Sequence, residues 1–166
     1  MNQEVLAAAK KLLETLTPLK TDCGTLCGAA CCQDNGEAGS GVWLLPGECA
    51  EAMRWGEVKQ TLMPVTGNAV RTLYCKGACE RGVRPFMCRI FPLTPYLSSK
   101  TGTWEVRLDR RAAAVCPLFD CGKRGLDPEF VSAATRAVRL LAGDAAYRRL
   151  LEVHQAEEQA FRELKL

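Results

Sequence analysis

The stretch CGTLCGAACC, residues 23–32, decides the fold because it places four cysteines within ten positions. Glycine and alanine fill most of the remaining positions, and no hydrophobic period runs through residues 21–41. Such a segment buries too little apolar surface to offset the ~1–2 kcal/mol per residue of backbone entropy that is lost on ordering. We therefore expect that a centre bound through its cysteines holds this segment together.

A second group of cysteines follows at Cys75, Cys79 and Cys88, and Cys116 stands directly before a proline. The chain has ten cysteines and a single histidine, which predicts a metal site made of thiolates and argues against a three-histidine zinc centre. Gaps of three residues let two sulfurs reach one ion from a single turn, whereas zinc ribbons commonly use gaps of two. The spacing therefore leaves zinc and an iron–sulfur cluster open as alternatives.

Basic residues accompany the second group of cysteines. A centre with four thiolates carries a net charge of about −2, so cations are expected beside it. Arg84 and Arg89 flank Cys88, and Lys76 and Arg81 lie in the same part of the sequence. Their N–H groups are candidates to donate hydrogen bonds to the sulfurs or to receive an anionic ligand. The alternative is an ordinary solvated basic face.

Three motifs, taken together, resemble the YkgJ-type family of zinc- or iron-chelating proteins. They are Cys23-x3-Cys27-Gly-x2-Cys31-Cys32, Cys79 followed by Arg-Pro-Phe-Met-Cys-Arg-Ile-Phe-Pro at residues 84–92, and Cys116-Pro117. The resemblance covers about residues 21–126, and the cysteine motif is also similar to that of flagellin lysine methylases, which is linked to an iron–sulfur cluster. It implies a 4Fe-4S cluster or zinc as the cofactor and hints at protein modification. With Cys75 added on its spacing, the expected metal ligands are Cys23, Cys27, Cys31, Cys32, Cys75, Cys79, Cys88 and Cys116.

Other residues leave alternatives open. Adjacent Cys31 and Cys32 cannot easily turn both sulfurs to one ion, so they serve different sites or one of them is a small buried hydrophobe. Cys49 stands alone on a predicted short helix and is expected in the core. Cys121 could ligate in place of the nearby motif cysteine or stay a free thiol. His154 lies on the apolar side of the last helix and is expected to be packed rather than to act as a ligand.

Hydrophobic periodicity predicts helices at both ends of the chain. The first spans residues 3–17, and a helical pair fills residues 127–166, with Glu157 and Glu158 on the solvated face of the last helix. The cysteine-rich region 21–126 is predicted to hold a short strand at 42–45 and two hairpins, one pairing 58–65 with 69–75 and the other pairing 93–98 with 103–108. The expected fold is α+β, a single domain over residues 1–166.

Composition and charge exclude several classes of partner. A formal net charge of +3 is too small to demand nucleic acid or an anionic membrane surface. The longest apolar run, residues 112–119, is far shorter than the ~20 residues that a bilayer-spanning helix needs. The first residues lack the pattern of a secretory signal, so we expect a cytoplasmic protein whose thiols stay reduced.

These observations favour a cytoplasmic metal-binding protein with an iron–sulfur cluster or zinc and a role in protein modification or redox chemistry. Its expected partners are the metal or cluster and a protein partner or substrate, and we assign no catalytic residue. The alternative is a structural zinc module for protein–protein interaction, because no histidine lies near the cysteines. A thiol-based metal carrier or redox sensor would need an exposed cysteine of low pKa beside Lys76 or Arg81.

Overall fold

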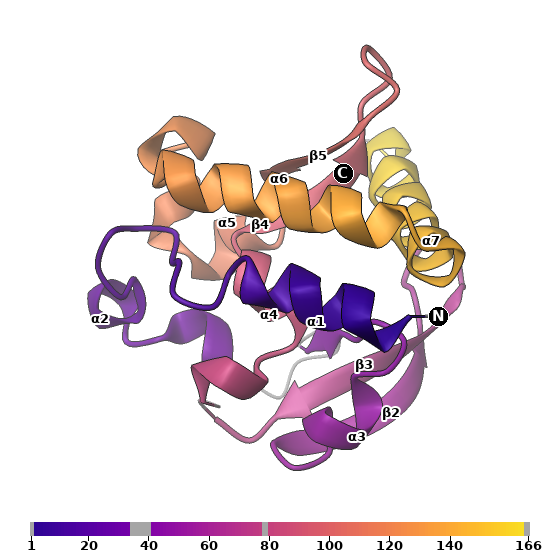
Figure 1. Cartoon of the computed structure of the whole chain (residues 1–166), viewed down its shortest axis with the longest axis horizontal. Coiled ribbons are helices and arrows are strands. Elements are labelled where there is room, and N and C mark those ends of the chain that lie inside the picture. Colours follow the sequence, from indigo (N-terminus) through magenta and orange to yellow (C-terminus); the bar gives the residue numbers. More distant parts are fainter. Residues whose placement is uncertain (1, 34–40, 78–79, 165–166) are drawn as a thin grey trace.

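Helices at both ends of the chain enclose the main hydrophobic core (Figure 1). In the computed structural model, which describes residues 2–33, 41–77 and 80–164, these helices are α1 (Gln3–Lys11), α6 (Pro128–Ala142) and α7 (Ala145–Glu163). The core gathers between them, and α6 contacts both α1 and the strand β5 (Trp104–Leu108). The predicted α+β class, with helices at both ends of one small domain, is confirmed.

The first helix is shorter than the predicted span of 3–17. Regular helix ends at Lys11, although Leu13 beyond it is still fully buried. Two guanidinium groups bind carbonyls at this end, since Arg89 Nη1 donates to Lys10 O at 3.3 Å and Arg81 Nε donates to Glu14 O at 2.9 Å. Cations are favourable near the last turn of a helix, so Arg89 stabilises this end of α1, and Arg81 holds the segment that follows it.

The strands form two separate antiparallel sheets. One sheet has the order β1–β3–β2, and the other pairs β4 with β5. Both predicted hairpins are confirmed, although the first strand of the first hairpin ends at Leu62 and not at residue 65. Met63 N donates to Asn68 O at 2.9 Å, and Gly67 N donates to Met63 O at 3.0 Å within the turn. The strands not yet given are β1 (Val42–Trp43), β2 (Gly56–Leu62), β3 (Ala69–Cys75) and β4 (Leu93–Leu97).

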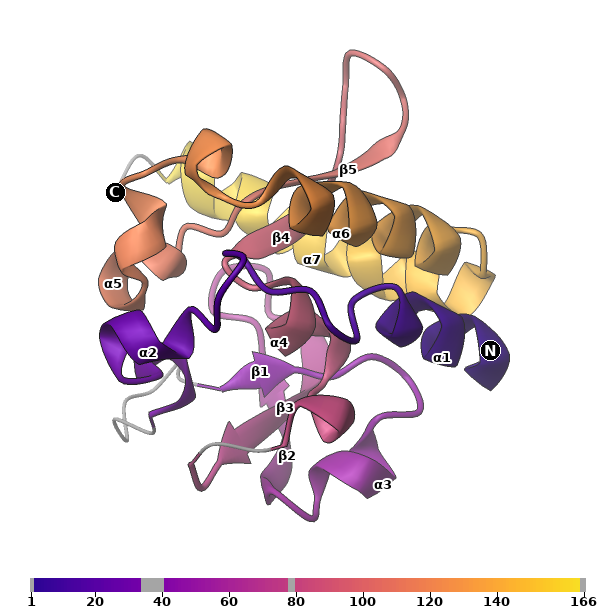
Figure 2. The same ribbon diagram turned by 60° about the vertical axis from the view of Figure 1, so that its left-hand side comes forward.

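Short helices carry most of the cysteine motifs. Figure 2 shows α2 beside α5, at the end of the molecule away from the N-terminus of α1. The short helices are α2 (Gly24–Cys27), η1 (Ala30–Cys32), α3 (Cys49–Ala52), η2 (Arg81–Val83), α4 (Phe86–Ile90), α5 (Ala112–Val115), η3 (Pro117–Phe119) and η4 (Lys123–Gly125).

Two carboxylates of α7 were expected in solvent and are instead buried. Glu157 accepts hydrogen bonds from Val65 N at 2.9 Å and from both the N–H and the hydroxyl of Thr66 at 2.8 Å. Glu158 is 1% exposed and accepts from Arg110 Nε at 3.2 Å. The prediction of a solvated face is wrong here, because partners from distant segments meet these charges on the helix surface.

None of the helices within the described residues combines the length and the apolar character that crossing a membrane requires.

Candidate metal centre

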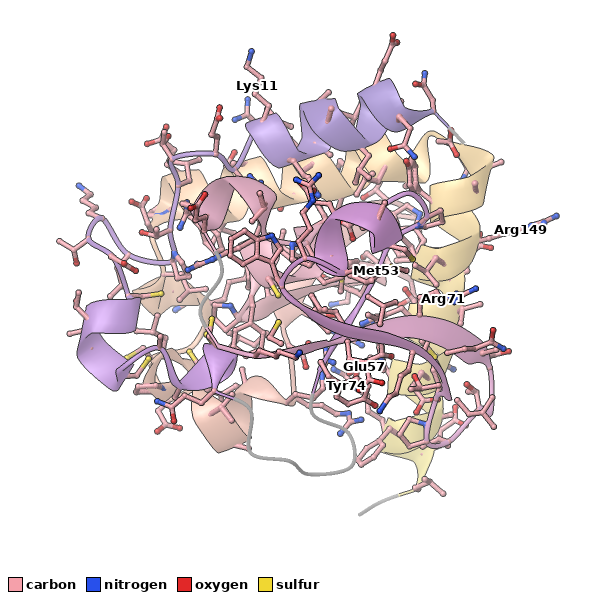
Figure 3. All side chains as sticks on the ribbon, turned by 90° about the horizontal axis from the view of Figure 1, so that it is seen from below. Lys11, Met53, Glu57, Arg71, Tyr74 and Arg149 are labelled. Carbon is pink, nitrogen blue, oxygen red and sulfur yellow. The ribbon has the colours of Figure 1, made fainter. Side chains whose placement is uncertain are left out.

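Thiols from two distant segments lie close enough to influence one another's ionisation. Burial raises the pKa of Cys23, and Asp22, Cys116 and Cys27 raise it further through electrostatic repulsion. Burial is also the main cause of the raised pKa of Cys116, with Cys27 adding to the rise. The helix α5, which ends just before Cys116, contacts η1. Figure 3 shows sulfur atoms gathered beside α2.

The backbone between α2 and η1 makes a sharp turn. Asp22 Oδ1 accepts from Gly24 N at 3.0 Å and so begins α2. Gly28 (φ 60°) and Ala29 (φ 55°) then adopt the left-handed conformation one after the other. A non-glycine residue rarely has positive φ, and strain of this kind is found where the surrounding structure imposes it. The turn folds the Cys31–Cys32 pair back toward the first two cysteines of the motif.

The adjacent cysteines of this pair differ in ionisation. Their side chains are hydrogen-bonded to each other, which raises the pKa of Cys31 and lowers that of Cys32 to about 6. Arg84 contributes to the lowering at Cys32. Cys31 is exposed, whereas Cys32 is half-buried. The thiolate form is therefore favoured at Cys32 over Cys31, and the thiolate is the form that binds a metal.

The remaining predicted ligands lie in other surroundings. Cys75, like Cys49, packs against the small apolar cluster of the three-stranded sheet. Cys88 interacts electrostatically with Arg111, whose pKa it helps to raise. Cys79 lies outside the described residues. That Cys75, Cys79 and Cys88 join the first motif around one metal stays a prediction.

Cys121 stands near Cys116 in the segment after α5. The two thiols interact electrostatically, and Cys121 is exposed. A side chain at Gly125 would bring its Cβ within 2.5 Å of the Cβ of Cys121, so glycine is needed where η4 passes beside Cys121. Cys121 thus extends the group of thiols toward the surface.

The two arginines expected beside the metal have different partners. Arg89 is 6% exposed and donates to backbone carbonyls, from Nε to Arg84 O at 3.0 Å, from Nη1 to Lys10 O and from Nη2 to Gly82 O. Burial lowers the pKa of Arg89, and the acidic groups around it, led by Glu48, act in the opposite direction. Arg89 therefore ties α1 to the segment before α4 and positions the backbone there.

The cations that act on the thiols are Arg84 and Arg81. Arg84 lowers the pKa of Cys32, and Arg81 acts in the same direction on Cys23. Neither arginine has to ligate a metal to have this effect, because a nearby positive charge stabilises a thiolate through space. Sequence reasoning counted both Arg81 and Arg84 among the cations expected beside the thiols.

The donor atoms fit a soft or borderline metal, although they are not arranged as ligands. Among the described residues, no group of three or more histidine, cysteine or acidic side chains has the geometry of a metal site. The thiols that influence one another are those of Cys23, Cys27, Cys31, Cys32, Cys116 and Cys121. All are free, and a set made only of sulfur suits zinc or an iron–sulfur cluster. Binding would require the side chains of this group to converge.

Sequence reasoning missed a buried polar cluster beside His154. Asp109 and Arg111 form an ion pair at 2.7 Å, and the Arg111 guanidinium lies over the Trp43 ring at 4.7 Å. His154 meets the same ring edge-on at 4.6 Å, and its Nε2 is 3.5 Å from Thr94 Oγ1. The one sequence signal for this cluster is the run Asp109-Arg110-Arg111, which directly follows the predicted strand at 103–108. The run does not indicate which residues pair with these charges.

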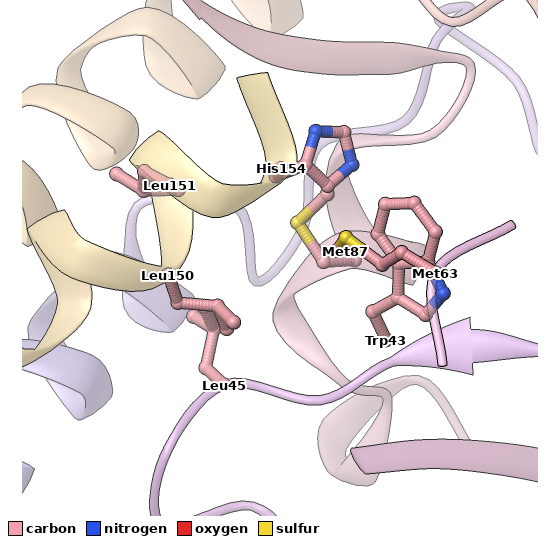
Figure 4. A pocket seen from close by; sticks show the side chains of 7 residues that line it. All are labelled: Trp43, Leu45, Met63, Met87, Leu150, Leu151 and His154. Carbon is pink, nitrogen blue, oxygen red and sulfur yellow. The ribbon is translucent and has the colours of Figure 1, made fainter. Parts of the chain in front are cut away.

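Figure 4 shows His154 lining a small, largely apolar pocket together with two methionines. The imidazole is 3% exposed, and among the described residues its Nδ1 has no hydrogen-bond partner. Burial, and then the Arg111 guanidinium, lowers the pKa of His154 to about 4. The interpretation of His154 as a packed histidine is confirmed. The other lining residues are Trp43, Leu45, Met63, Met87, Leu150 and Leu151.

Comparison of the chain with protein-family models, with curated proteins and with solved structures finds no match.

Proposed function

We propose that this protein binds a metal centre, a 4Fe-4S cluster or zinc, through the thiolates of its first cysteine motif and of Cys116. The observation that carries the proposal is the position of Cys116. It follows α5, far along the chain from the first motif, and yet its thiol interacts with those of Cys23 and Cys27. Free thiols without disulfide bonds are the chemistry that soft metals select.

The electrostatics around the thiols support the same proposal. Several half-buried thiols repel one another when ionised, which is why burial and neighbouring sulfurs raise the pKa of Cys23 and Cys116. A bound cation would remove this repulsion, since a metal holds its coordinating thiols in the deprotonated form. Arg81 and Arg84 would offset the remaining negative charge of a four-thiolate centre.

A bound iron–sulfur cluster would supply electron transfer, whereas zinc would supply structural cross-linking of the segment. The resemblance to the flagellin lysine methylases supports a role beside a protein-modification or redox reaction. The alternative is a structural zinc module that presents a surface to a protein partner. It is supported by the position of His154, the single histidine, which is buried against Trp43 and Thr94 and is not available as a base beside the thiols.

Metal content of matched cysteine variants tests the proposal. Cys116→Ser should lower the metal retained per chain after anaerobic purification at least ~10-fold, because the centre loses one ligand from its second segment. Cys49→Ser is the control, since Cys49 is a half-buried thiol packed against the three-stranded sheet. Full metal content in Cys116→Ser, or an equal loss in both variants, would contradict the proposed centre.

A further inference from the structure

A polar groove lies between the β4–β5 hairpin and the C-terminal half of α7, away from the cysteines. Its volume is about 480 Å³, within the range of pockets that hold small molecules. Figure 1 shows the loop that joins β4 and β5 projecting beyond the helices on this side of the molecule. The polar lining includes Ser98, Ser99, Lys100, Arg107, Gln159 and Arg162.

The residues that line the groove carry positive charge and no negative charge. Three cations line it, and no aspartate or glutamate does. Within the described residues no ion pair engages Lys100 or Arg162. Arg107 Nη2 is 4.0 Å from Glu158 Oε2, and the other oxygen of that carboxylate accepts from Arg110 Nε at 3.2 Å. One carboxylate thus faces two guanidinium groups and balances Arg107 only in part. Cations that face one cavity whose lining holds no acidic group favour a bound anion.

The side chain of Arg107 is held in place, and its Nε–H donor has no partner among the described residues. Its guanidinium lies 5.1 Å from the centre of the Tyr96 ring, and the Tyr96 hydroxyl donates to Glu105 at 2.8 Å. Among the described residues Arg107 Nε has no hydrogen-bond partner although it is buried. Burial and then the charge of Arg162 lower the pKa of Arg107, which shows that the two guanidinium groups act on each other. An oxyanion between them would satisfy the free N–H and relieve the repulsion.

The outer edge of β4 is blocked to an added peptide strand at its last residue, Leu97. Gln155 Oε1 accepts from the Leu97 N–H, and Gln155 Nε2 donates to Leu97 O at 3.3 Å. The side-chain amide thus takes the place of a neighbouring strand at this position. Strand addition needs those backbone groups free, so the groove suits a small anion better than an extended peptide.

We propose that this groove binds a small organic phosphate. Arg107 and Arg162 would hold the phosphoryl oxygens, because guanidinium groups match phosphate geometry through paired N–H donors. Lys100 would add a third positive charge from the hairpin loop. Ser98, Ser99 and Gln159 offer neutral groups for the rest of the molecule. This site is independent of the metal centre.

Titration of the full chain with sodium pyrophosphate tests the proposal. Calorimetry measures the binding, and backbone amide NMR shifts locate it on the chain. We expect saturable binding with shifts at residues 96–100, weakening as salt increases. Arg162→Gln should weaken binding at least ~10-fold and Lys100→Gln should weaken it less. Arg149→Gln is the control, because Arg149 is an exposed cation on the same helix and does not line the groove (Figure 3).

Several outcomes would overturn the proposal. One is the absence of binding at millimolar pyrophosphate to a chain whose NMR spectrum shows it folded. Another is equal weakening in Arg162→Gln and Arg149→Gln, which would mean attraction to the whole basic surface. Shifts confined to residues 23–32 would show that pyrophosphate acts on the metal centre instead. Tighter binding of citrate than of pyrophosphate would assign the groove to carboxylates.

Discussion

Acidification should destabilise the protein through His154, and the size of the effect follows from its burial. The folded state holds the pKa of His154 at about 4, whereas an unfolded histidine titrates near ~6.5. The unfolded state therefore binds more protons between these values, and the free energy of unfolding falls as the pH falls. The contribution is fully present above about pH 6.5 and would be lost by about pH 4.

The free energy of unfolding is expected to fall by about 2 kcal/mol between pH 7 and pH 5, and by about 3 kcal/mol once the folded-state pKa is passed. Most carboxylates are still ionised at pH 5, and His154 is the single histidine of the chain. The buried site cannot easily hydrate an imidazolium, because Trp43, Thr94 and the Arg111 guanidinium surround it. The first steep part of the acid transition should therefore belong to this one group.

Urea denaturation at pH 7, 6 and 5 measures the effect in the wild-type chain and in two variants. His154→Gln and His154→Leu cannot take up the proton, so their stabilities should change by about 2 kcal/mol less over this range. Titration of the thiols, including Cys32, is common to all three proteins and cancels in the difference. Parallel curves for the wild type and both variants would refute the reasoning, as would an NMR titration of His154 near pH 6.5.

Three further predictions follow from other contacts. Glu157→Gln should lower the free energy of unfolding by about 2 kcal/mol in urea denaturation, because it removes a charged acceptor from buried N–H groups; an unchanged midpoint would contradict this role. Arg84→Gln should raise the pKa of Cys32 and weaken metal retention about 10-fold in competition with a chelator. The same change at Arg89 should lower folding stability instead, because Arg89 binds backbone carbonyls. An equal loss of metal in both variants would contradict these separate roles. Chelation should remove hydrogen-exchange protection from residues 23–32 while α6 keeps most of its own, and uniform exchange would contradict a centre that organises that segment.

The elements that sequence predicted well are those set by local pattern. The helical spacing of apolar residues predicts α6, and Asp127 caps this helix by accepting from Glu129 N at 2.8 Å. The hairpins follow from strand alternation and turn residues. The early end of α1 was not predictable, because it depends on arginines more than sixty positions away.

The burial of charged side chains could not be predicted from the sequence either. Glu157 looks solvated on a helical wheel, and only the turn between β2 and β3 supplies the donors that bury it. Arg89 illustrates the same limit near the candidate centre. It adjoins Cys88 in sequence, but its guanidinium binds carbonyls of α1 and of the segment before α4. Arg84, five positions earlier, lowers the pKa of Cys32 instead.

X-ray absorption fine structure at the metal edge of the anaerobically purified chain tests the central claim most directly. Thiolate ligation predicts a first shell of sulfur at ~2.3 Å from the metal, with iron and sulfide both present if a cluster is bound and zinc alone otherwise. A first shell of nitrogen or oxygen near ~2.0–2.1 Å, or a purified chain that contains no metal, would contradict a centre held by Cys116 and the first cysteine motif.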